Sequence, residues 1–157
     1  MPPTDSDGRA DAARPSSCTG QAHGAVIQDV LAIVRGVDQR SLHPVASRQA
    51  GLAFQPRTLL VTVTYCYSIG IYCSQEIELE IAHGADFCRL DSEEFPRWKL
   101  IRQFRRLNHG VVQDCLATVL ARQARTQIPS GRFHCFSDEA ERRLSEAACL
   151  DSLADDD

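Results

Sequence analysis

The segment FPRWKLIRQFRRLN, residues 95–108, decides the fold class of this chain. Its apolar side chains recur with a period of about 3.6 residues, which is the period of an α-helix. Those on the apolar face are Leu100, Ile101, Phe104 and Leu107. On the opposite face lie Lys99, Arg102 and Arg106, with Arg105 beside them. The pattern predicts a helix from Trp98 to Asn108 that buries one face and offers the other to a partner.

Positive charge is concentrated in this helix. Residues 97–106 hold five basic side chains and no acidic one, in a chain of net charge −4, so the remainder carries −9. A polyanion is the simplest partner for such a surface, and nucleic acid is the commonest polyanion. The candidate nucleic-acid-binding residues are Arg97, Lys99, Arg102, Gln103, Arg105 and Arg106, where the amide of Gln103 could pair with adenine. The alternative is a solvated face that pairs with Asp91, Glu93 and Glu94 just upstream.

The 157 residues suffice for one domain, and two segments before the basic helix shape its expected core. Residues 25–37, AVIQDVLAIVRGV, place apolar side chains at helical spacing, although their β-branched content leaves a strand possible. Residues 57–70, RTLLVTVTYCYSIG, fit both a helical face and the alternation of a strand, which their pattern favours. Pro56 suits the first turn of a helix at this point.

Three further helices are expected from start and stop signals. Ser74 is a candidate N-cap for QEIELEIA, which Gly84 would end. A second amphipathic helix, VVQDCLATVLARQA, would follow a break near His109 and Gly110. The last helix would run from about Ser137, as its N-cap, to Leu153. We expect residues 1–24 to be disordered, residues 25–153 to form the helical domain and residues 154–157 to form an acidic tail.

The sequence favours a binding protein over an enzyme. It contains no Walker or Rossmann phosphate loop and no HExxH motif, and adjacent His134 and Cys135 lack the spacing of a zinc site. The seven cysteines are odd in number and form no CxxC pair, which favours reduced thiols packed as small hydrophobes. We therefore expect no catalytic residue, metal or cofactor, with a cysteine–histidine enzyme as the weaker alternative. No segment resembles a signal peptide or a membrane span, so we expect a soluble, cytoplasmic protein.

Three motifs follow one another along the chain in an order that matches a known family. Pro56, Leu59, Leu60, Tyr65, Tyr67 and Gly70 match an AxxPRxLLxxLLYxYxxG helix. Ser74, Glu76, Ile77 and Glu78 match a helix start of the type SSREIE. Pro96, Ile101, Phe104, Arg105 and Arg106 match a Pro-led helix that ends in an FRR motif. From about Val26 to Leu153 the chain resembles the amino-terminal domain of InsH-type bacterial insertion-sequence DDE transposases.

The resemblance implies a fold and a function. It implies a small all-α bundle with a helix-turn-helix-like unit, and it favours a helix over residues 61–65. It also implies recognition of double-stranded DNA at insertion-element ends, with a homodimer or a full-length transposase as possible protein partners. In the family, an RNase H-like catalytic domain follows, and the terminal DSLADDD does not resemble it. We therefore expect DNA binding without strand transfer, with a regulatory interaction module or a non-functional truncated remnant as alternatives.

One departure from the family pattern concerns the start of the basic helix. Trp98 and Lys99 stand where the family often has a polar residue before the FRR helix. A tryptophan at this place can either anchor the core or stack on a partner, and we favour the core.

Overall fold

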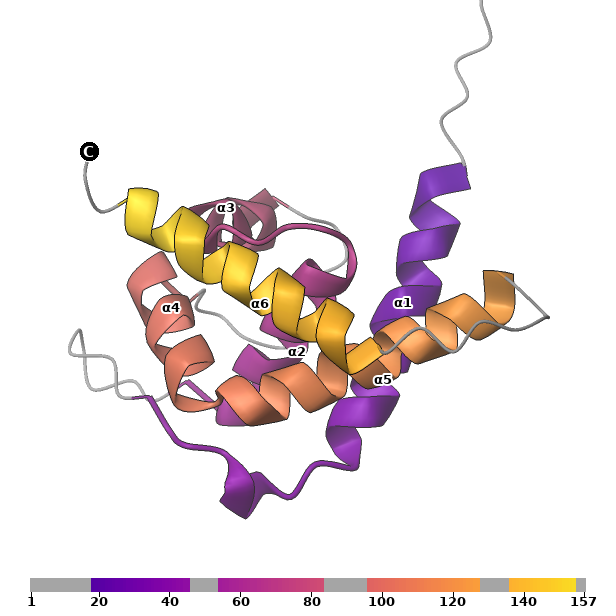
Figure 1. Cartoon of the computed structure of the whole chain (residues 1–157), viewed down its shortest axis with the longest axis horizontal. Helices are drawn as coiled ribbons and strands as arrows, with labels where there is room; N and C mark the ends of the chain where they lie inside the picture. The colour runs from indigo at the N-terminus through magenta and orange to yellow at the C-terminus, as the bar shows by residue number, and fades with distance from the viewer. Residues whose placement is uncertain (1–17, 46–53, 84–95, 128–135, 155–157) are drawn as a thin grey trace, which may run out of the picture.

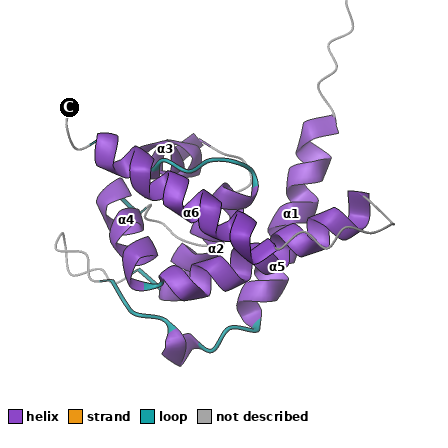
Figure 2. Ribbon diagram, in the orientation of Figure 1, coloured by secondary structure: helices purple, strands orange, loops and turns teal. Residues whose placement is uncertain are grey.

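The computed structural model describes residues 18–45, 54–83, 96–127 and 136–154, and within these ranges every regular element is helical (Figure 1, Figure 2). The α-helices are α1 (Cys18–Arg35), α2 (Pro56–Ser68), α3 (Ser74–His83), α4 (Trp98–Leu107), α5 (His109–Gln127) and α6 (Phe136–Leu153), and a 3₁₀ turn, η1 (Gln39–Ser41), follows α1. The predicted all-α bundle is confirmed, whereas its helix-turn-helix-like unit stays a prediction. None of the helices in the described ranges is long and apolar enough to cross a membrane.

Helix α2 is the centre of the bundle. It packs against α1, α4 and α5, and ten consecutive residues from Leu59 to Ser68 are buried. A helix that is buried all round has no one-sided apolar stripe, which is why its sequence fits two periods. The strand favoured by the alternation of residues 61–65 is therefore wrong, and the helix implied by the family resemblance is confirmed. Pro56 occupies the first turn of α2, as expected.

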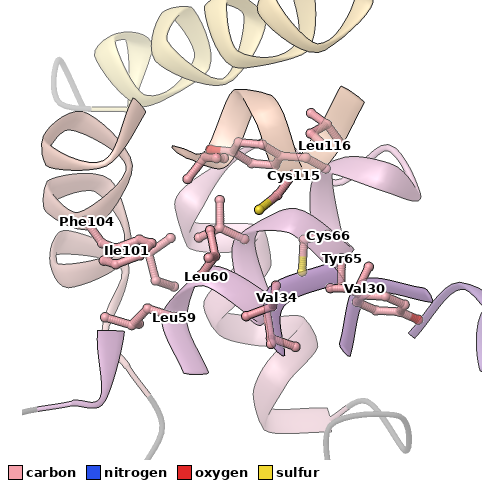
Figure 3. Close-up of a cluster of buried hydrophobic side chains, with 14 of the residues drawn as sticks. Val30, Val34, Leu59, Leu60, Tyr65, Cys66, Ile101, Phe104, Cys115 and Leu116 are labelled. Carbon is pink, nitrogen blue, oxygen red and sulfur yellow. The ribbon is translucent and has the colours of Figure 1, made fainter. Parts of the chain in front are cut away.

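The core is built around α2 from side chains of α1, α3, α4, α5 and α6 as well as its own, and Figure 3 labels those of α1, α2, α4 and α5. Val30 and Val34 of α1 lie on one side of α2, and Ile101 and Phe104 of α4 lie beside its Leu59. Cys115 and Leu116 of α5 contribute a third side. These side chains are almost fully removed from water, so hydrophobic burial fixes the relative places of α1, α2, α4 and α5.

Several predicted boundaries need correction. Helix α1 begins at Cys18 rather than near Ala25, since a helix extends at little cost beyond a packed stretch. The predicted disorder is thus wrong for residues 18–24, and residues 1–17 lie outside the described residues. The break before α5 is only Asn108, so Gly110 lies within the helix. Helix α6 begins at Phe136, which places Ser137 inside it rather than at its N-cap.

Other sequence predictions fall on parts of the chain that the structure does not describe. These are the helix stop at Gly84, the acidic alternative partners Asp91, Glu93 and Glu94, the pair His134 and Cys135, and residues 155–157 of the acidic tail.

Candidate nucleic-acid interface

Helix α4 presents two chemically different faces, as its sequence predicts. Leu100, Ile101 and Phe104 are buried in the core. The opposite face meets solvent. Lys99, Gln103 and Arg106 are exposed there, and Arg102 is half-buried. Arg97 precedes the first turn and is also exposed. Four of the five predicted cations therefore lie at or near the surface of one helix.

Arg105 is the exception, and its assignment as a candidate phosphate contact is corrected. Only 3% of its side chain is exposed, and its Nη1 atom lies 2.8 Å from Oδ2 of Asp151 in α6. The same Nη1 atom donates a hydrogen bond to the hydroxyl oxygen of Tyr67 in α2, at 3.2 Å. A guanidinium in this position is paired within the protein, so Arg105 joins helices rather than contacting a partner.

Leu107 departs from the prediction in the opposite sense. Its side chain was expected on the buried face, but 47% of it is exposed at the C-terminal end of α4. Arg105 and Leu107 flank the apolar face on opposite edges, and the bundle covers the edge of Arg105. The exposed surface of α4 is consequently less cationic and more apolar than the sequence predicts.

Asp151 connects α6 to the start of α3. Its Oδ1 atom accepts a hydrogen bond from the backbone N–H of Ser74 at 2.9 Å, and Oδ2 accepts one from the Ser74 hydroxyl at 2.7 Å. Ser74 is the first residue of α3, so this carboxylate occupies the place of an N-cap, where the helix dipole favours negative charge. The prediction that Ser74 is the N-cap of α3 is wrong, because Ser74 is the first residue of the helix and its hydroxyl donates a hydrogen bond to Asp151.

Glu78 makes the equivalent connection from α3 to α4. Its Oε2 atom accepts a hydrogen bond from the backbone N–H of Trp98, the first residue of α4, at 2.9 Å. Three polar contacts thus form a closed ring: α6 caps α3 through Asp151, α3 caps α4 through Glu78, and α4 returns to α6 through Arg105. We call this set the capping ring. It fixes the direction and rotation of α4 relative to its neighbours.

The C-terminal end of α4 is fixed by Asn108, which is 2% exposed. Its Oδ1 atom accepts from the backbone N–H of His43 at 2.7 Å, and its Nδ2 atom donates to the carbonyl oxygens of His43 and Phe104, each at 3.1 Å. The corner between α4 and α5 is therefore tied to the segment that follows η1.

The electrostatic surroundings of α4 are asymmetric. On one side α4 packs against α3, which carries Glu76, Glu78 and Glu80 and reaches the first residue of α4 through Glu78. Trp98 is half-buried rather than a core anchor, and the Nζ atom of Lys99 lies 5.2 Å from the centroid of its ring. This cation–π contact holds the Lys99 ammonium close to the start of the helix.

The cysteines give little support to thiol chemistry. Cys66, Cys73, Cys115 and Cys149 are free, which agrees with the predicted reduced thiols, although Cys73 is half-buried and Cys149 is exposed. Burial raises the pKa of the Cys66 thiol far above its ordinary value and raises that of Cys115 to about 11. These two thiols remain protonated and unreactive at neutral pH. Within the described ranges, no three potential metal ligands gather in one place.

Comparison with known proteins gives no match to a protein-family model, to a curated protein or to a solved structure. The resemblance to transposases therefore stays a prediction from the quoted motifs.

Proposed function

We propose that this chain is a DNA-binding module like the amino-terminal domain of insertion-sequence transposases, and that it binds insertion-element ends in the cytoplasm without cutting them. The observation that carries the proposal is the solvent-facing surface of α4, where Arg97, Lys99 and Arg106 are exposed and Arg102 is half-buried. No acidic residue belongs to this helix. Duplex DNA offers phosphate oxygens that such side chains bind in known complexes.

The strength of the expected salt dependence follows from the number of cations that contact phosphate. Each phosphate contact contributes about 0.9 to the slope of log K against log salt concentration. Burial of Arg105 leaves four cations, so the slope should be about −3.6 if all four contact phosphate. The affinity should then fall about 150-fold between 50 and 200 mM salt.

The test is a duplex-binding titration at several salt concentrations with the double variant Lys99→Ala/Arg106→Ala. Both side chains are exposed, so the fold should tolerate their loss. We expect weaker binding and a slope that is smaller by about 2. The matched control, Arg35→Ala/Arg125→Ala, removes two exposed cations from the ends of α1 and α5 and should leave the slope unchanged. Equal slopes for the wild type and the α4 variant would remove α4 from the interface.

A second candidate function is a protein-interaction module that forms a homodimer or docks on a full-length transposase. It is favoured by two exposed leucines on helices joined by the capping ring: Leu79 of α3 is 61% exposed and Leu153 of α6 is 62% exposed. Sedimentation of the chain without DNA would distinguish the candidates. Self-association that Leu79→Ala abolishes, together with an absence of duplex binding, would favour the second.

A further inference from the structure

The exposed side of α4 carries two rows of side chains with different chemistry. Residues four apart in a helix lie on the same side, about 6 Å apart along the axis. Arg102 and Arg106 form a cationic row. The neighbouring row contains Lys99, Gln103 and Leu107, of which the last two are uncharged. The C-terminal part of α4 therefore has a cationic edge and a neutral edge.

The outward position of Leu107 is held by the structure around it. The next residue, Asn108, is 2% exposed, and its side chain makes three hydrogen bonds, which reach His43 and Phe104. Helix α5 begins immediately afterwards, at His109. Since this corner is fixed on both sides, Leu107 is presented to solvent beside Gln103 and Arg106 by a defined backbone.

Resting on the proposed binding of duplex DNA, we infer that Gln103 and Leu107 are the base-reading pair of α4, while Arg102 and Arg106 hold one phosphate strand. The Gln103 amide can donate to N7 and accept from N6 of adenine in the major groove, and an apolar side chain packs on the C5 methyl of thymine. The two side chains are about 6 Å apart along the helix, close to two base-pair steps of 3.4 Å. The target is a duplex with an adenine and a thymine at that separation.

Charge complementarity favours DNA over protein as the occupant of this surface. A protein that covered Leu107 closely would also remove water from Arg106, one residue away, and would have to supply a buried carboxylate for it. A DNA groove offers an apolar methyl and, at its edge, phosphate oxygens. The neutral and cationic rows thus correspond to the base edges and the backbone of one strand.

The test begins with selection of a preferred sequence from a pool of randomised duplexes by the full chain. Copies of the selected duplex then carry uracil in place of each thymine in turn, which removes only the C5 methyl. We expect one replacement to weaken wild-type binding about fourfold. The Leu107→Ala variant should bind the duplex with thymine at that position and the duplex with uracil there with equal affinity. Gln103→Ala should lose at least about fivefold of the preference for adenine at one position. Neither variant should change the salt slope, because neither removes a charge.

The outcomes separate this inference from the proposed function. Leu79→Ala, which truncates an exposed leucine on α3, is the matched control and should retain the thymine preference. If the chain binds duplex DNA in a salt-dependent way but Leu107→Ala keeps the thymine preference, the inference is overturned and the proposed function stands. An absence of duplex binding by the wild type would overturn both. If Leu107→Ala loses self-association but keeps the base preference, Leu107 is a protein contact and the inference is overturned.

Discussion

Replacement of Asp151 by asparagine is expected to destabilise the protein by about 3–5 kcal/mol, the usual cost of leaving one partner of a buried ion pair without its counter-charge. The side-chain amide can still accept from the backbone N–H of Ser74, so the cap of α3 is largely kept. The guanidinium of Arg105, however, would remain buried without the counter-charge of Asp151. Domains of this size are stable by about 5–15 kcal/mol, so the loss is a large part of the total.

Urea unfolding followed by circular dichroism measures this loss. With a slope of about 2 kcal/mol per molar urea, the midpoint should fall by about 1.5–2.5 M. The double variant Arg105→Met/Asp151→Asn removes the charge together with its partner and should recover most of the stability. The control is Arg142→Ala, whose ion pair with Glu139 spans 2.7 Å, close to the 2.8 Å of the Arg105–Asp151 pair.

The two ion pairs have similar lengths but differ strongly in burial. The side chains of Arg142 and Glu139 are 58% and 35% exposed, against 3% and 2% for Arg105 and Asp151. Arg142→Ala should therefore leave the urea midpoint almost unchanged. The reasoning is refuted if Asp151→Asn costs no more than this control, or if the double variant is as unstable as Asp151→Asn alone.

Two further predictions concern ionisable groups. Burial raises the pKa of Tyr67 to about 12, so the folded state favours the protonated phenol. The resulting contribution to the free energy of unfolding is complete below pH 10 and is lost as the pH rises towards 12. Cys66 and Cys115 lower the stability over the same range in both proteins, so urea titrations should show a fall that is larger in the wild type than in Tyr67→Phe by up to about 3 kcal/mol, and equal falls would contradict the assignment. In the native protein, Cys149 should react with a maleimide within minutes, whereas Cys66 and Cys115 should react only on unfolding, as mass spectrometry of peptides would show. Rapid native labelling of Cys115 would contradict its burial.

Hydrophobic periodicity in the sequence predicts the helices that have one solvent-exposed face. It fails to identify α2 as a helix, because α2 has no such face. Helix α4 shows a clear period because solvent meets one side of it, and its bounds differ from the prediction by one residue. Helix α2 is buried over Leu59–Ser68, so hydrophobicity carries no information about its period. Pro56 indicated the start of a helix, but the family resemblance decided between helix and strand, through motifs rather than through periodicity.

The sequence of α4 could not show which edge of its apolar face is buried in the bundle. Arg105 and Leu107 flank this face on opposite sides, and local periodicity favours the leucine for burial. The bundle reverses this choice because α6 brings Asp151 to the edge of Arg105, 46 positions further along the chain. A signal was present: Asp151 continues the stripe of Ala140, Leu144 and Ala147, which are all buried. A carboxylate on an apolar stripe indicates a buried partner, but not which cation it meets.

The capping ring changes how mutations in the FRR segment should be interpreted. Arg105 and Arg106 are adjacent in sequence, yet one is buried against Asp151 and the other faces solvent. Loss of Arg106 removes one of the proposed phosphate contacts and should lower the salt slope by about 1. Loss of Arg105 instead leaves Asp151 as a buried charge and releases α4 from α6, so binding would fall through the folded fraction. Only the slope, measured on folded protein, separates a contact with DNA from a support for the helix that makes it.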